Sequence, residues 1–182
     1  MNSALQLERR IWLAWFRCLG LTPKTAYERQ AQASFRRAGK KVRELDVVTA
    51  LRQCRVAVFG DDRFVAEDQD EILRLWKRFP VREKTILLTD RSNTRNPLLV
   101  YARRKRWRVI RLSRAGTLLQ ADRRMLRAVE KHQRESQKLI VWTGSLRVAP
   151  SSLPKLFKRH HIKTVFIALE AVEARWRSGT TS

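Results

Sequence analysis

The chain has 182 residues, of which 40 are Lys or Arg and 17 are Asp or Glu, giving a formal net charge of +23. Self-repulsion of this size is normally relieved by a polyanion, so phosphate is the expected counter-charge. Hydrophobic residues make up 43% of the chain and six residues are Trp, which excludes a disordered basic tail and indicates a folded domain with a core.

The cysteines and the hydropathy pattern exclude further classes of protein. Cys18 and Cys54 lack the CxxC spacing of zinc sites and are too few for a disulfide scaffold. We therefore expect two small buried thiols in a reducing compartment. No apolar run is long enough to span a membrane, so neither a membrane-spanning segment nor a membrane partner is expected.

Residues 1–53 are predicted to form a basic helical extension. An apolar stripe at helical spacing predicts a first helix that ends at Gly20. Thr22, which precedes a proline, is expected to cap a second helix that reaches about Arg37. A short third helix is expected near 45–52.

From Cys54 onward, short β-rich runs alternate with helical stretches, which is the rhythm of repeated βα units. The runs are continuously apolar, as strands buried on both faces require. The sequence therefore predicts an α/β fold over 54–177. We expect three layers, with helices on both faces of a mostly parallel five-stranded sheet, and a C-terminal tail at 178–182. The expected strands span 55–59, 85–89, 107–112, 139–142 and 164–169.

Helices are expected between these strands and after the last one. Asn96 is predicted to cap one of them, and Ser151 or Ser152 another. The expected helices span 67–79, 97–105, 118–133, 153–160 and 170–177.

The charge is unevenly distributed along the chain. Between Arg91 and Lys163, twenty basic residues face only three acidic ones, whereas residues 61–71 hold six acids and one Arg. One side of the domain is therefore expected to face phosphate and another to face solvent or a basic partner. Because 29 of the 40 basic residues are Arg, which grips phosphate in a bidentate manner and stacks on unpaired bases, structured RNA is favoured.

Several groups of residues are expected to contact this RNA. The turn at 103–108 places Trp107 among charges, an arrangement suited to base stacking, although Trp107 could instead begin a buried strand. Basic residues from 123 to 134 share one helix face. The expected RNA-binding residues are Arg36, Arg37, Lys40, Lys41, Arg103, Arg104, Lys105, Arg106, Trp107, Arg108, Arg123, Arg124, Arg127, Lys155, Lys158, Arg159 and Lys163.

Motifs for cofactor chemistry are missing from the sequence. It contains neither the phosphate loop GxxxxGK[ST] nor the dinucleotide fingerprint GxGxxG, so no cofactor is expected. The three histidines lack ligand partners at metal spacing, and no metal site is expected from them.

Carboxylates after the expected strands leave one catalytic alternative open. Parallel sheets place functional groups at the carboxyl ends of their strands, where Asp61, Asp62, Asp90 and Glu170 are expected. Such a cluster could hold Mg²⁺ for phosphodiester cleavage. Alternatively, the aspartates cap helices and turns.

Residues 67–110 contain a series of acidic and apolar residues that can be compared with a known family. The series consists of Asp68, the run Glu71-Ile72-Leu73 and the stretch Ile86-Leu87-Leu88-Thr89-Asp90-Arg91, followed by Asn93, Arg95, Ala102 and Val109. On these residues, the segment weakly resembles part of a PIN-like domain. It implies that Asp90, with Asp68 or Asp70, binds Mg²⁺ in a metal-dependent ribonuclease or an RNA-processing or ribosome assembly factor. The family's opening strand has no counterpart here, and two further βα units follow.

In composition and layout, an Arg-rich α/β domain with a basic helical extension is similar to mitochondrial ribosomal proteins. This resemblance implies a non-catalytic structural component that contacts ribosomal RNA in the mitochondrial matrix, or otherwise in the cytoplasm. The N-terminal helices would then contact neighbouring proteins of the assembly. A DNA-binding protein is a further alternative.

Overall fold

A computed structural model of the chain describes residues 25–37, 44–61, 66–78, 84–91, 94–113 and 116–168. Several expectations lie outside these ranges: the helix before Gly20, the cap at Thr22, the basic residues Lys40 and Lys41, the acids Asp62 and Glu170, the helix at 170–177 and the tail. In the described part of the chain, no helix is long and apolar enough to cross a membrane.

The predicted parallel sheet of five strands is confirmed, and every strand pair in it is parallel. The strands lie in the order β3-β2-β4-β1-β5, so β4 is the middle strand, β2 and β1 flank it, and β3 and β5 form the edges. Their bounds are β1 Val56–Asp61, β2 Thr85–Thr89, β3 Arg108–Arg111, β4 Lys138–Gly144 and β5 Thr164–Ala168.

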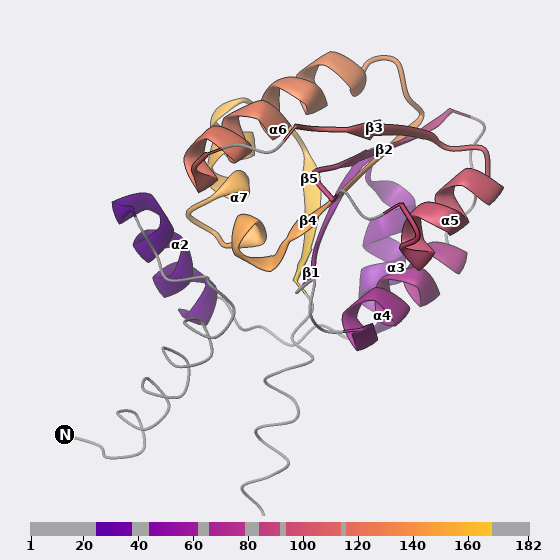
Figure 1. Cartoon of the computed structure of the whole chain (residues 1–182), viewed down its shortest axis with the longest axis horizontal. Coiled ribbons are helices and arrows are strands. Elements are labelled where there is room, and N and C mark those ends of the chain that lie inside the picture. The colour runs from indigo at the N-terminus through magenta and orange to yellow at the C-terminus, as the bar shows by residue number, and fades with distance from the viewer. Residues whose placement is uncertain are drawn as a thin grey trace, which may run out of the picture.

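Helices cover both faces of the sheet, as the sequence predicts (Figure 1). Helices α3, α4 and α5 lie on one face, and α6 and α7 lie on the other. The helices are α2 Ala26–Arg37, α3 Glu44–Gln53, α4 Ala66–Lys77, α5 Pro97–Arg104, α6 Leu118–His132 and α7 Leu153–Arg159, with a 3₁₀ turn η1 at Ser145–Val148.

The strands bury alternate residues in two hydrophobic cores. In β1, Ala57 and Phe59 face the core under α3, α4 and α5, whereas Val56 and Val58 face the core under α6 and α7. All six residues of β1 are buried. Burial on both faces explains why the strands are continuously apolar in sequence.

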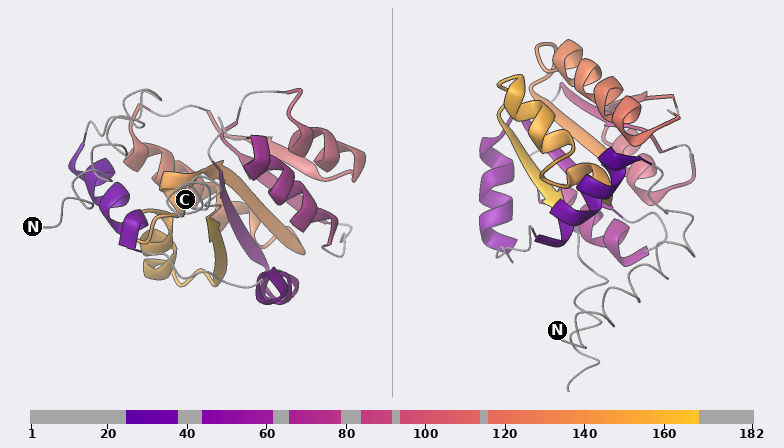
Figure 2. Two further views of the ribbon diagram at one scale, coloured as in Figure 1. Left: turned by 90° about the horizontal axis from the view of Figure 1, so that it is seen from below. Right: turned by 90° about the vertical axis from the view of Figure 1, so that its left-hand side faces the viewer.

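The described N-terminal helices belong to the α/β domain. In α3, Val48 and Leu51 are buried in the same core as Trp76. Helix α2 packs against η1 and α6, and its Ala31 is fully buried (Figure 2). Helix α3 therefore contributes apolar residues to the core beneath the sheet.

Helix caps agree with the sequence in part. Asn96 caps α5 as predicted, since its side chain accepts from the Leu98 backbone N–H at 2.9 Å. At α7, Ser152 occupies the cap position, but neither predicted serine makes a side-chain cap bond there. Helix α2 begins at Ala26, where the side chains of Thr25 and Glu28 accept from each other's backbone N–H groups at 3.2 and 3.1 Å in a capping box.

Candidate nucleic-acid interface

The carboxyl edge of the sheet contains the topological switch point of the fold. Strand β4 lies between β2 and β1. The connections after β1 and β2 pass through α4 and α5 on one face, whereas the connection after β4 passes through η1 and α7 on the other. Open α/β sheets bind ligands at such points, so a ligand site is expected at this edge.

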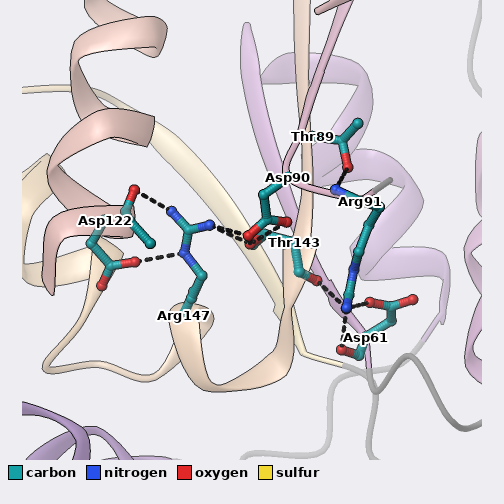
Figure 3. A network of polar contacts seen from close by, with 8 residues as sticks. Asp61, Thr89, Asp90, Arg91, Asp122, Thr143 and Arg147 are labelled. Atoms are coloured by element: carbon teal, nitrogen blue, oxygen red, sulfur yellow. Dashed lines mark hydrogen bonds and ion pairs between the residues drawn. The ribbon is translucent and has the colours of Figure 1, made fainter. Parts of the chain in front are cut away.

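A buried arginine, Arg147, joins two carboxylates at this edge (Figure 3). Its Nη1 donates to Asp90 Oδ2 at 2.5 Å and to Thr143 Oγ1 at 2.9 Å. Its Nε donates to Asp122 Oδ1 at 2.6 Å, and its Nη2 donates to the Ala121 carbonyl at 2.6 Å. The guanidinium is thus bonded through all three nitrogens, which a buried charge requires.

A second arginine neutralises the carboxylate at the end of β1. The Arg91 Nη2 donates to the Asp61 side chain and backbone carbonyl, and to the carbonyl of Thr143 at 3.3 Å. The Asp61 side chain is fully buried, so this ion pair is part of the fold's interior.

The metal site of the ribonuclease alternative is not assembled among the described residues. Asp90 faces Arg147, Asp68 is buried in α4, and Asp70 is exposed. Nowhere in residues 25–168, apart from the gaps noted above, do three or more Asp, Glu, His or Cys side chains form a group that could hold a metal ion. The geometry gives this alternative no support. Arg147 was missed by sequence reasoning, because only the fold brings it to these carboxylates.

Helix α2 docks onto the same network. The Tyr27 hydroxyl donates to Asp122 Oδ2 at 2.8 Å. Burial raises the pKa of the Asp122 carboxyl, and the charge and hydrogen bonding of Arg147 oppose that rise in part. The pKa of Tyr27 is also raised, first by burial and then by the Asp122 charge. The fold therefore favours a neutral phenol at position 27.

The amino edge of the sheet is lined with basic residues. Because all strands are parallel, the turn that enters each strand lies at this edge, and so do the carboxyl ends of α3 to α7. We call this set the basic rim. It comprises Arg52, Arg55, Lys77, Arg78, Lys84, Arg103, Arg104, Lys105, Arg106, Arg108, Lys131, Arg134, Lys158, Arg159 and Lys163, all of which are exposed.

Few carboxylates offset this rim within the described ranges. Glu130 bonds the His160 ring at 2.7 Å, and Glu135 bonds both His132 and Arg108. The hydrogen bond from His132 holds the pKa of Glu135 below its usual range, which keeps this carboxylate charged. No carboxylate of the described chain pairs with the exposed residues Arg104, Arg106, Arg134, Lys158, Arg159 and Lys163.

Helix dipoles explain only part of the rim. Each of α3 to α7 carries one or two basic residues in its last turn, where they stabilise the negative end of the helix. Arg55, Lys105, Arg106, Arg134 and Lys163 lie beyond those turns. The helix dipoles therefore do not account for the charges of these residues.

The base-stacking role expected for Trp107 is not available, because this side chain is only 6% exposed. Its ring packs against Trp76 and Tyr101, with ring centroids 5.2 and 5.8 Å away. The cause is a Schellman motif at the end of α5, in which the Trp107 N–H bonds the Ala102 carbonyl and the Arg106 N–H bonds the Arg103 carbonyl. The residue in the place of Trp107 packs back onto its helix in such motifs.

The same motif ends α7, and both motifs contain strained backbone. The Ile162 and His161 N–H groups bond the carbonyls of Phe157 and Lys158. Arg106 has a φ of 57° and His161 a φ of 54°, in the left-handed region that favours glycine. Arg106 of the rim and the neighbouring surface residue His161 thus stand at positions where glycine would relieve strain.

The other predicted residues extend this surface over one face of the sheet. Arg123, Arg124 and Arg127 are exposed on the side of α6 that faces away from the core. Helix α7 packs beside α6 (Figure 2). Lys155 is exposed on α7, and the contact between His160 and Glu130 joins the end of α7 to α6. Arg36 and Arg37 lie in the last turn of α2, where the structure describes the backbone alone.

Comparisons with known proteins identified no relative of this chain. No protein-family model matches the chain, and searches of curated proteins and of solved structures found no match.

Replacing Tyr27 with Phe is expected to lower the free energy of unfolding by about 1–2 kcal/mol at pH 8, because Asp122 loses a donor. The unfolded chain ionises this tyrosine near pH 10, whereas the fold keeps it neutral, so its contribution is present below that pH and declines above it. Urea unfolding at pH 8 and near pH 11 should show the difference between the wild type and Tyr27→Phe narrowing. At pH 8, Tyr101→Phe is the control for loss of the hydrogen bond, since the Tyr101 hydroxyl makes only a 3.4 Å bond. A difference that widens at high pH would contradict this assignment.

Replacing Arg106 with Gly is expected to stabilise the fold by up to about 1 kcal/mol, because glycine adopts the left-handed backbone without strain. Arg104→Gly is the matched control. The same exchange two residues earlier, at the last residue of α5, should destabilise the fold by up to about 1 kcal/mol. Thermal and urea unfolding measure whether each variant is more or less stable than the wild type. A destabilised Arg106→Gly would show that the arginine itself supports the fold.

Proposed function

We propose that this protein is a non-catalytic RNA-binding component of a ribonucleoprotein, and that the basic rim with the outer faces of α6 and α7 forms its RNA-binding surface. The observation that carries the proposal is the concentration of unneutralised basic side chains at one edge of the sheet. An extended anion that follows this edge would reach every cluster, and a polynucleotide backbone is such an anion.

The surface favours contacts with the phosphate backbone. Trp107 and Tyr101 pack into the domain, so the described rim offers charges and hydrogen-bond donors to a ligand. Such contacts position a protein on nucleic acid without reading its sequence. We therefore expect steep salt dependence and little sequence preference. The Arg-rich composition favours structured RNA over duplex DNA as the ligand.

Exchanging two rim arginines for glutamate, in Arg104→Glu/Arg134→Glu, is expected to weaken binding to a structured RNA at least about tenfold near physiological salt. The slope of log K against log salt should fall as phosphate contacts are lost. The matched control is Arg29→Glu/Arg111→Glu, which changes the net charge equally at exposed positions on α2 and at the carboxyl end of β3. Fluorescence anisotropy over a salt series measures both.

Equal weakening in the two variants would show that net charge alone drives binding and would remove the rim as the interface. Wild-type protein that ignores RNA at low salt would overturn the proposed function altogether. A competing duplex DNA that displaces the RNA at equal concentration would favour the DNA-binding alternative.

The particle that we propose is the mitochondrial ribosome, where the protein would contact ribosomal RNA and neighbouring proteins. This proposal is supported by the likeness of composition and layout. Native protein should therefore sediment with a ribosomal subunit on a sucrose gradient, and should leave that fraction at high salt because phosphate contacts weaken. Sedimentation as a free protein in mitochondrial and cytoplasmic extracts at low salt would contradict it.

A further inference from the structure

An open hollow of about 450 Å³ lies in the middle of the basic rim. It is formed where α3 enters β1 and where the turn after α6 enters β4, and these two strands are neighbours in the sheet. A water molecule occupies about 30 Å³ in the liquid, so the hollow has room for a phosphate group with its solvent. It is lined by Arg52, Gln53, Cys54, Arg55, Ser136 and Gln137.

The guanidinium of Arg55 is held in place at the wall of this hollow. Its Nε and Nη2 donate to the Ser136 carbonyl at 3.0 and 2.8 Å, and Nη2 also donates to the Arg134 carbonyl at 3.3 Å. Its Nη1 has no partner within the described chain. A guanidinium fixed by backbone carbonyls binds an anion with little further loss of side-chain freedom.

A buried lysine removes the negative charge that a helix end would otherwise present to the hollow. The carboxyl end of α3 points here, and its unbonded carbonyls would repel an anion. The Lys138 ammonium donates to the carbonyls of Leu51 and Cys54 and lies 3.3 Å from Cys54 Sγ. Arg52 adds an exposed positive charge in the last turn of the same helix.

We infer that this hollow is a phosphate-binding subsite, and that its occupant is a backbone phosphate of the bound polynucleotide. Arg55 and Arg52 supply the charge, and the amides of Gln53 and Gln137 supply further hydrogen-bond donors. The inference rests on the proposed function, because it names one contact of the same surface. Its position at the centre of the rim lets one strand of phosphates continue toward the clusters that precede β3 and β5.

Cys54 provides a direct reporter, since it lines the hollow and is partly exposed. In a Cys18→Ser chain, Cys54 is the remaining cysteine, and its alkylation by iodoacetamide can be followed by mass spectrometry. RNA at about ten times its Kd should slow this alkylation about tenfold, because the Cys54 thiol does not react while the hollow is occupied. Inorganic phosphate alone, in a parallel arm, tests whether the group binds without the polynucleotide.

Two charge-matched variants separate a seated phosphate from general shielding by RNA. Arg52→Gln/Arg55→Gln removes the cationic side chains of the hollow, whereas Arg104→Gln/Lys158→Gln removes two rim charges outside it. At RNA concentrations that saturate each variant, the first should lose most of the protection of Cys54 and the second should keep it. The single variant Arg52→Gln, at an exposed position, should lose part of the protection of Cys54. It replaces the double variant if circular dichroism shows that the double variant is unfolded.

The outcomes distinguish the two proposals. Three results would overturn the phosphate subsite and leave RNA binding intact. They are RNA binding that leaves Cys54 unprotected, protection of Cys54 by inorganic phosphate but not by RNA, and equal protection of Cys54 in both double variants. Failure of the wild type to bind RNA at low salt would overturn the proposed function itself. The subsite is supported if RNA protects Cys54 in the wild type and in Arg104→Gln/Lys158→Gln but not in Arg52→Gln/Arg55→Gln.

Discussion

The parallel direction of all five strands is the constraint on which the rest of this structure depends. Every strand must be re-entered from the same edge, so each connecting helix runs back across a face of the sheet and ends at the amino edge. Helix carboxyl ends and strand-entry turns therefore collect at one edge. Helix amino ends and strand carboxyl ends collect at the other. The uneven distribution of charge along the chain therefore becomes a difference in charge between the two edges of one sheet.

Arginine has opposite roles at these two edges. At the carboxyl edge, Arg91 and Arg147 are largely buried and bonded to carboxylates and carbonyls, because a charge removed from water must be neutralised there. At the amino edge, residues such as Arg104 and Arg134 remain in water and lack carboxylate partners in the described chain. These exposed side chains can exchange water for phosphate at little cost. The same residue type thus supports the fold at one edge and, in our proposal, binds RNA at the other.

In our proposal, the rim also reflects a compromise between backbone strain and RNA binding. Schellman motifs at the ends of α5 and α7 bury Trp107 and Ile162, which closes the core beneath the edge strands. The motif needs a left-handed residue, and the chain has Arg106 and His161 there instead of glycine. Retaining basic side chains at strained positions is consistent with a role for them at the surface. The anchored Arg55 beside the hollow fits the same pattern, since its bonds orient it without neutralising it.

The sequence by itself determined the elements of the α/β domain, because alternating apolar runs and amphipathic stretches report burial locally. It also predicted the parallel sheet, since strands separated by helices require crossovers. Only the tertiary structure decided which charges share an edge, since that depends on the strand order. It placed Arg147 between Asp90 and Asp122, turned Trp107 into the core and brought Arg52 and Arg55 to one hollow. Contacts between residues distant along the chain are set by packing, which no local pattern records.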